Sequence, residues 1–195
     1  MTKNIAVFAS GTGSNAKKII DHFKHHPRIN VCLLVCNRPG AKVLEMAEEE
    51  GVPTLLINRN EFYKEKRILK KFKIYSVDFV VLAGFLWLVP GYLVKSYENR
   101  MINIHPALLP RYGGKGMYGM NVHRAVKESA DRESGITIHY VNEQYDDGDI
   151  VFQKACSLSD TDTPETIAKK VQQLEHRYFP VVIENLIAGN NTPAR

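Results

Sequence analysis

The sequence of 195 residues has no apolar run that approaches the length of a membrane-spanning helix. Such a helix takes about 20 residues, whereas the longest apolar run here, residues 79–89, is interrupted by Gly84. Residues 1–4 also lack the layout of a secretory signal peptide. We therefore expect a cytoplasmic protein with no membrane partner.

Cysteine is scarce, with only Cys32, Cys36 and Cys156, and three thiols cannot all pair with one another. Each lies in apolar surroundings, which is typical of reduced thiols inside a cytosolic protein. Cys32 and Cys36 can share one face of a strand, but no His or further Cys completes a set of zinc ligands. The sequence predicts no metal site.

The net charge of +5 is concentrated in the first part of the chain, where six of the ten residues in the segment 64–73 are Lys or Arg. This basic segment fits the solvated face of a helix, and it also fits a surface that attracts an anionic substrate. The segment has few aromatic residues and no nucleic-acid-binding motif accompanies it. We therefore expect no nucleic-acid partner.

The content of 44% hydrophobic and 24% charged residues is typical of a globular domain, and the length suits a single one. In the first hundred residues, short β-branched runs alternate with helical patterns, which predicts a parallel, doubly wound sheet. The expected strands are residues 5–9, 31–36, 54–57 and 78–83, and the expected helices follow residue 15 and cover 41–50 and 61–73.

The second half has a different pattern, because two of its expected strands, 135–141 and 150–156, form a hairpin-like pair around the turn 146–149. A short strand at 100–104 and a helix near 121–130 precede this pair. A last helix starts with Thr163 as N-cap and Pro164 at its first position. Its expected buried stripe is Ile167, Val171, Leu174, Tyr178 and Val182.

We predict one domain over residues 1–195 with an α/β fold. A Rossmann-like parallel sheet occupies residues 1–100 in this prediction, and a mixed sheet continues it in residues 101–195.

A glycine-rich segment, residues 10–15 with the sequence Ser-Gly-Thr-Gly-Ser-Asn, lies between the first expected strand and helix. Glycines let the backbone approach a ligand closely, and N–H groups at a helix start bind phosphate. With Ala16 the segment also satisfies the loose dinucleotide pattern. No Asp or Glu follows the second strand to hold a ribose, although Arg38 suits a 2′-phosphate. We favour phosphate binding, with a tight turn that binds nothing as the alternative.

The segment 103–110, Asn-Ile-His-Pro-Ala-Leu-Leu-Pro, places Asn103 and His105 two residues apart on an extended chain. Their side chains are therefore expected to project from the same face. An amide donor beside an imidazole suits the stabilisation of an oxyanion coupled to proton transfer. A structural His in a rigid loop is the alternative. A further His, His139, is interpreted as buried structure or as a neighbour of the site.

Three carboxylates crowd into four residues at Asp146, Asp147 and Asp149. Such a cluster can bind a metal, bind a polar substrate or tune a histidine. Asp and Gly are also the residues from which ordinary turns are built. By itself this segment decides nothing.

Together these motifs resemble the folate-dependent formyltransferases over nearly the whole chain. The matching segments, in the order of the family, are 10–15, 80–85, 103–110, 135–148 and 173–176, followed by Pro180. The resemblance implies transfer of a formyl group from 10-formyltetrahydrofolate, a co-substrate, to the amine of 5-phosphoribosylglycinamide in purine synthesis. It implies small-molecule substrates only, and a monomer or weak homodimer.

The resemblance also implies roles for individual residues. Asn103, protonated His105 and Asp146 are the expected catalytic residues, with Asp146 raising the pKa of His105 and helping to hold a water. The expected substrate-binding residues are Gly11, Thr12, Gly13, Ser14, Asn15 and Glu175, the last of these at the ribose. The expected folate-binding residues are Leu86, Trp87, Leu88 and Val89, together with Asn103.

Three features depart from the family pattern, and one of them is the region 58–75, which is shorter than in many members. The loop 111–120 after the His-Pro motif is longer than usual, and Trp87 stands where an Arg is common. Alternatives within the family are a formyltransferase for another amine or a formyltetrahydrofolate hydrolase. A more remote alternative is an NADP-binding oxidoreductase or nucleotide sensor that uses the segment 10–15.

Overall fold

A computed structural model of the chain describes residues 2–189. The chain forms two compact units that divide between residues 102 and 103. This division falls two residues from the predicted border between the parallel half and the mixed half. Each unit has its own hydrogen-bonded strands and helices.

The first unit is built on four parallel strands in the order β3-β2-β1-β4. Their bounds are β1 Lys3–Ala9, β2 Ile29–Cys36, β3 Thr54–Leu56 and β4 Phe79–Leu82. Residues 5–9 of β1 and all of β4 are buried, because helices cover both faces of a parallel sheet. The predicted parallel sheet is therefore confirmed.

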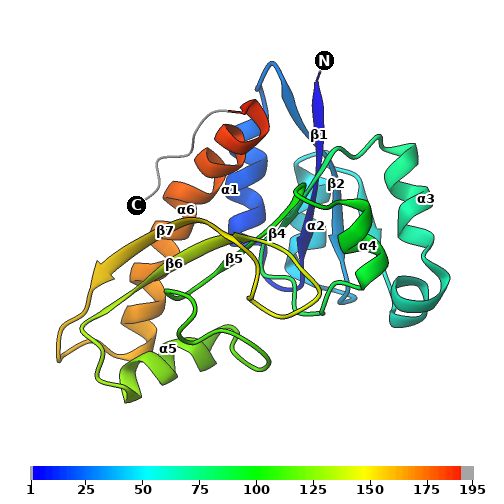
Figure 1. Cartoon of the computed structure of the whole chain (residues 1–195). Helices are drawn as coiled ribbons and strands as arrows, with labels where there is room; N and C mark the ends of the chain where they lie inside the picture. The colour runs from blue at the N-terminus through cyan, green and yellow to red at the C-terminus, as the bar shows by residue number, and fades with distance from the viewer. Residues whose placement is uncertain (1, 190–195) are drawn as a thin grey trace. The chain divides into compact units, whose positions relative to one another are not determined.

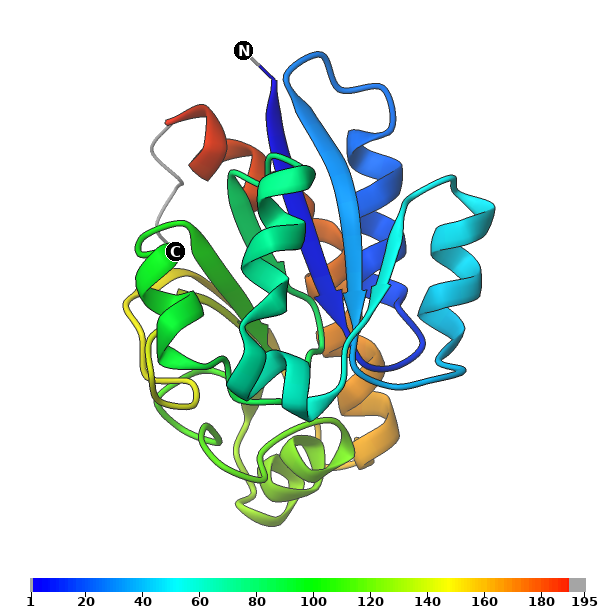
Figure 2. The same ribbon diagram turned by 90° about the vertical axis from the view of Figure 1, so that its right-hand side faces the viewer.

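The helices of the first unit lie on both sides of these strands, with α1 and α3 on opposite sides of β1 (Figures 1 and 2). Their bounds are α1 Ser14–Phe23, α2 Lys42–Glu49, the π-helical turn η1 Glu61–Glu65, α3 Arg67–Ile74 and α4 Gly91–Ser96. Phe72 of α3 packs edge-on against Phe8 of β1, with ring centroids 6.0 Å apart. The six-residue α4, which follows Pro90, was not predicted.

The single helix predicted over residues 61–73 was wrong. Lys66 adopts a left-handed backbone conformation (φ +54°) and separates η1 from α3. Phe62 and Ile68 are both buried, but residues six apart point in directions about 120° apart on a continuous helix. The break at Lys66 allows both side chains to reach the core. The basic side chains of the segment are exposed, and Arg67 pairs with Glu61 at 3.3 Å.

The second unit contains the antiparallel pair predicted by the sequence. Strand β6, Glu133–Tyr140, pairs with β7, Ile150–Ser157, and the register shifts between Ile138 and His139. Strand β5, Met101–His105, begins in the first unit and ends in the second, where it neighbours β6. Helix α5, Met120–Glu128, lies near α6, Pro164–Ala188, which packs behind β6 and β7 (Figure 1).

Helix α6 starts as predicted, with Thr163 as N-cap and Pro164 at its first position. The Thr163 side chain accepts a hydrogen bond from the Thr166 backbone N–H, and the Thr166 hydroxyl accepts one from the Thr163 N–H. The buried stripe was only partly predicted. Ile167, Val171 and Val182 are buried, whereas Leu174 and Tyr178 are half-buried. The buried residues that the predicted stripe missed are Phe179, Pro180 and Ile183. Pro180 lies inside this helix, where proline commonly bends the axis and so shifts the buried face. No helix in the described part of the chain has the length and apolar character of a membrane span.

Replacement of Thr163 by Ala is expected to lower the free energy of unfolding by about 1 kcal/mol, because an N-terminal backbone donor of α6 loses its partner. Urea denaturation followed by circular dichroism measures this change. Thr161→Ala is the matched control, since Thr161 is exposed and outside the helix. Equal destabilisation by both variants would contradict the capping role.

Candidate active site

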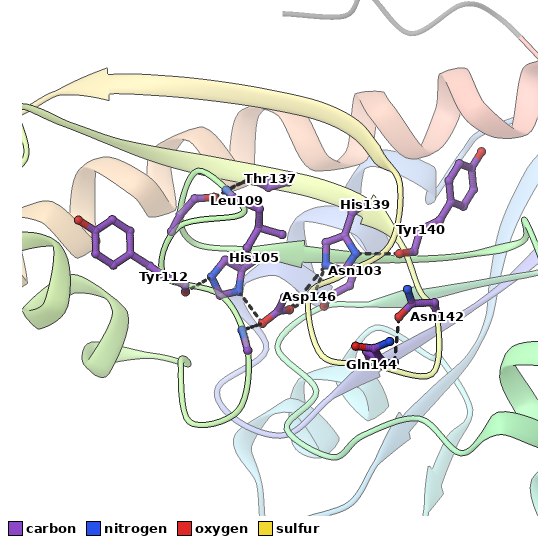
Figure 3. A network of polar contacts seen from close by, with 12 residues as sticks. Asn103, His105, Leu109, Tyr112, Thr137, His139, Tyr140, Asn142, Gln144 and Asp146 are labelled. Atoms are coloured by element: carbon purple, nitrogen blue, oxygen red, sulfur yellow. Dashed lines mark hydrogen bonds and ion pairs between the residues drawn. The ribbon is translucent and has the colours of Figure 1, made fainter.

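The end of β5 carries the polar centre of the second unit. Asn103 and His105 lie two residues apart on this strand, and both face Asp146 from the β6–β7 loop (Figure 3). Asn103 Nδ2 donates to Asp146 Oδ1 at 3.3 Å, and His105 Nδ1 lies 3.4 Å from Asp146 Oδ2. The structure thus brings together the three residues predicted to be catalytic.

Thr137 of β6 holds the segment that follows His105. Its hydroxyl donates to the Ala107 carbonyl at 2.7 Å and accepts from the Leu109 N–H at 3.0 Å. Gln153 of β7 donates to the Leu109 carbonyl at 2.9 Å. Thr137 is fully buried, so these bonds form without competition from water. The chain after His105 therefore has a fixed path, which keeps the imidazole in place.

Both ring nitrogens of His105 have protein partners. Nε2 lies 2.7 Å from the Tyr112 carbonyl, which only accepts hydrogen bonds, so Nε2 carries a proton. Nδ1 faces the carboxylate of Asp146. A neutral ring with its proton on Nε2 turns a lone pair toward that carboxylate, whereas an imidazolium donates to both neighbours. The geometry therefore favours the protonated ring.

The pKa of His105 is nevertheless lowered from its ordinary value of 6.5 in the ligand-free protein. Burial is the largest cause, because the ring is 3% exposed and charge is poorly solvated there. The charge of Asp146 and the Tyr112 carbonyl both act to raise the pKa, and His139 acts to lower it. Asp146 thus acts on the pKa of His105 in the predicted direction, but the burial of the ring outweighs it and lowers the pKa overall.

Asp146 occupies a turn that only certain residues can form. Its own φ is +53°, a conformation that Asp tolerates better than most residues. A side chain at Gly148 would collide with the Tyr140 carbonyl, so glycine is required there. The backbone N–H of Gly114 donates to Asp146 Oδ2 at 3.0 Å. Burial acts to raise the pKa of Asp146, but the nearby His139 ring, the bond from Gly114 and the charge of His105 lower it overall.

His139 belongs to the same network. Its Nδ1 lies 2.8 Å from the Tyr140 carbonyl, so Nδ1 carries the proton in the neutral ring and Nε2 is an acceptor. Asn103 Nδ2 donates to that Nε2 at 3.1 Å. The two hydrogens of the Asn103 amide are therefore directed at His139 and Asp146. The sequence allowed two interpretations of His139, a buried structural residue or a neighbour of the site. The contact with Asn103 shows that it is a neighbour of the site.

The glycine-rich segment 10–15 lies in the first unit, between β1 and α1. Gly13 has φ +80°, and a Cβ there would lie 2.7 Å from the Val43 Cβ, so both conformation and space require glycine. No side chain caps α1, and no acidic residue occupies its first turn. This arrangement leaves the helix start suited to an anion. Ser10 ties the segment to residues 84–86, because its Oγ accepts from the Leu86 N–H at 3.0 Å.

The segment 86–89, predicted to meet folate, also lies in the first unit. Leu86 is 46% exposed, whereas Val89 is 3% exposed and part of the core. Trp87 is half-buried, and the guanidinium of Arg59 lies over its ring, 5.0 Å from the centroid. A cavity of about 330 Å³ opens beside this pair and is lined by Asn37, Pro39, Leu56, Ile57, Asn58, Arg59, Glu61 and Trp87. Apolar walls with a few polar groups are typical of small-molecule sites.

Glu175, predicted to reach a ribose, is half-buried on α6. The described residues contain no group of three or more His, Cys, Asp or Glu side chains placed to hold a metal ion.

The family model for formyl transferases matches residues 3–183 of the chain. The chain belongs to the formyl transferase family. The match covers both units, and it includes the Asn103, His105 and Asp146 cluster as well as the segment 10–15.

Two members of the family illustrate the likeness in sequence. A phosphoribosylglycinamide formyltransferase of Bacillus subtilis is 38% identical over 194 residues, which cover 97% of each chain. A chloroplastic phosphoribosylglycinamide formyltransferase of Arabidopsis thaliana is 43% identical over 187 residues. That alignment covers 93% of the present chain and 64% of the plant protein, so the plant protein is the longer of the two.

Solved structures of the family have the same fold. A phosphoribosylglycinamide formyltransferase of Bacillus halodurans is 37% identical, with a TM-score of 0.85 over 95% of this chain and 96% of its own. A glycinamide ribonucleotide transformylase of Geobacillus kaustophilus is 34% identical, with a TM-score of 0.86 over 95% and 99%. The predicted fold class is therefore confirmed.

The pKa of His105 in the ligand-free protein is expected below 6.5, and Asp146→Asn is expected to lower it further by removing the charge that favours the imidazolium. Titration of histidine-labelled protein by NMR measures both values. Asp147→Asn is the control, because Asp147 is an exposed carboxylate in the same turn.

The same lowered pKa makes unfolding pH-dependent. Below 6.5 the unfolded chain binds more protons at this residue than the folded chain, so stability falls as the pH drops through that window. If the pKa of His105 rose in Asp146→Asn, the stabilising effect of the Asp146 charge on the imidazolium would be refuted.

Proposed function

We propose that this protein transfers the formyl group of 10-formyltetrahydrofolate to the amine of 5-phosphoribosylglycinamide, a step of purine synthesis that we place in the cytoplasm. The single observation that carries the proposal is the cluster of Asn103, His105 and Asp146 in a chain similar to its Bacillus subtilis relative from end to end. Small molecules are its only expected partners, and we propose a monomer or weak homodimer.

The chemistry starts with attack of the amine on the formyl carbon, which places negative charge on the formyl oxygen. Asn103 is suited to stabilise this charge, since amide N–H groups are effective oxyanion donors. Asn103 Nδ2 lies 3.1 Å from His139 Nε2 and 3.3 Å from Asp146 Oδ1, so the hydrogen bond to Asp146 is the longer of the two. We infer that the longer bond to Asp146 yields to the oxyanion, while His139 keeps the amide oriented.

His105 supplies positive charge to the oxyanion in this proposal. When the tetrahedral adduct collapses, the bond between the formyl carbon and N10 of the folate breaks, and His105 donates a proton to the departing N10, which leaves as part of tetrahydrofolate. The imidazolium form of His105 suits both of its neighbours, and developing negative charge nearby raises its pKa from the low value of the ligand-free protein. Asp146 supports the charged ring and, once released by Asn103, is suited to hold a water that relays the proton from the amine. The cluster thus combines an oxyanion donor, a general acid and a carboxylate.

The remaining roles concern binding. We propose that Gly11, Thr12, Gly13, Ser14 and Asn15 hold the substrate phosphate, because their segment opens an uncapped helix. Glu175 is proposed to bind the ribose. The exposed Leu86 and the cavity beside Trp87 support a folate site that includes the backbone of Leu88 and Val89. Arg59 supplies a cation there that the sequence pattern did not single out.

Activity is the direct test. Purified protein is expected to formylate 5-phosphoribosylglycinamide, and Asn103→Ala or His105→Ala is expected to lower kcat by about 10²–10³ with a small change in KM. His25→Ala is the control, because His25 is exposed and outside the cluster. Wild-type protein that does not turn over this pair of substrates would sink the proposal.

The phosphate site is tested separately by Gly13→Ala. The added methyl group would press on Val43, so the segment must shift and KM for the phosphorylated substrate is expected to rise roughly tenfold or more. Gly40→Ala is the matched control: Gly40 also has a positive φ (+67°), but no atom lies within 4 Å of its added methyl group. A KM that changes equally in both variants would argue against a phosphate site at residues 10–15.

A further inference from the structure

We propose that Tyr112, in the first part of the long loop 111–120, and Asp131, which follows helix α5, form a clamp that positions His105 for proton transfer. The inference rests on the proposed function, because it assigns a positioning role within the same reaction. Neither residue touches the reacting atoms in this proposal. Both act through the backbone carbonyl that His105 Nε2 contacts.

The carbonyl of Tyr112 is the inner part of the clamp. It lies 2.7 Å from His105 Nε2 and is closer to the imidazole than the Asp146 carboxylate, which lies 3.4 Å from Nδ1 (Figure 3). Tyr112 has φ +59°, a conformation that is unfavourable for a non-glycine residue. Such backbone strain persists only where surrounding contacts enforce it. The side chain of Tyr112 supplies those contacts.

The phenol of Tyr112 is the outer part of the clamp. Its oxygen lies 2.5 Å from Asp131 Oδ2 and 2.5 Å from Ser129 Oγ. Burial and the bond to Asp131 raise the pKa of this phenol, which keeps its proton in place for the carboxylate. Arg111 donates to the same Asp131 oxygen at 2.9 Å, and the Ser129 hydroxyl, at the end of α5, is placed to donate to the phenol oxygen. The ring is therefore tied to the end of α5.

The next two residues of the loop extend the clamp to Asp146. The Gly114 N–H donates to Asp146 Oδ2, the same oxygen that faces His105. Gly113 packs so closely that a Cβ there would lie 2.6 Å from Leu109 Cδ2 and 3.3 Å from Asp146 Cβ. One short segment thus sets the positions of both members of the His105–Asp146 pair.

The clamp also decides which forms of His105 are allowed. A neutral ring with its proton on Nδ1 would turn the Nε2 lone pair toward the Tyr112 carbonyl, which is repulsive at 2.7 Å. The carbonyl therefore keeps a proton on Nε2 and raises the pKa of the ring, against the effect of burial. Loss of the clamp is therefore expected to change the pKa of His105, which loss of ordinary structural support would not do.

Tyr112→Phe tests the clamp, since it removes only the phenolic oxygen. We expect the pKa of His105 to fall below the wild-type value and kcat to fall roughly tenfold, with KM changed by less than about twofold. The measurements are NMR titration of His105 in the ligand-free protein and steady-state formylation kinetics. Tyr118→Phe is the matched control, because Tyr118 lies in the same loop and is 53% exposed.

Variants of Asp131 provide a second, independent test of the clamp. Asp131→Ala is expected to reproduce the effect of Tyr112→Phe, and the double variant is expected to be little worse than either one, because both break the same contact. Asp131→Asn keeps an acceptor for the phenol and is expected to recover most of the activity.

Unchanged His105 titration in folded Tyr112→Phe would overturn the clamp, and so would additive losses in the double variant. Wild-type protein without formyl transfer would instead overturn the proposed function. The NMR measurement, which needs no substrate, still tests the clamp in that case.

Discussion

The carboxylate of Asp146 is the interaction on which the polar centre of the second unit depends. It accepts from Asn103 and Gly114, and it faces both His105 and His139. Its side chain is only 11% exposed, so bulk water competes little with these partners. Removal of this one charge would leave His105 without its carboxylate and would take one acceptor from the Asn103 amide.

Strand β6 and its loop supply the frame for this centre. Thr137 and His139 lie two residues apart on β6, so they face the same side of the sheet as a pair. Thr137 holds the backbone after His105, and His139 holds the amide of Asn103. The C-terminal end of β5 is thus held by the neighbouring strand β6. The reacting side chains have little freedom to move, which limits the reorganisation that the reaction requires.

Much of this arrangement could be predicted from local pattern. Asn103 and His105 share a strand, so their two-residue spacing was enough to place them together, and the capping of α6 by Thr163 follows from residue type. Contacts made across the chain left no local signal. The partnership of Asp146 with His105 needed the family resemblance, and the net pKa of His105 depends on burial that no motif encodes.

The cation–aromatic pair of the first unit has an optical consequence. Trp87 is the only tryptophan of the chain, it lies on the wall of a cavity, and a guanidinium covers its ring. The intrinsic ultraviolet emission of the protein therefore comes largely from one half-buried indole. Any occupant of that cavity changes the surroundings of this single fluorophore, so the molecule carries a built-in optical reporter that needs no label.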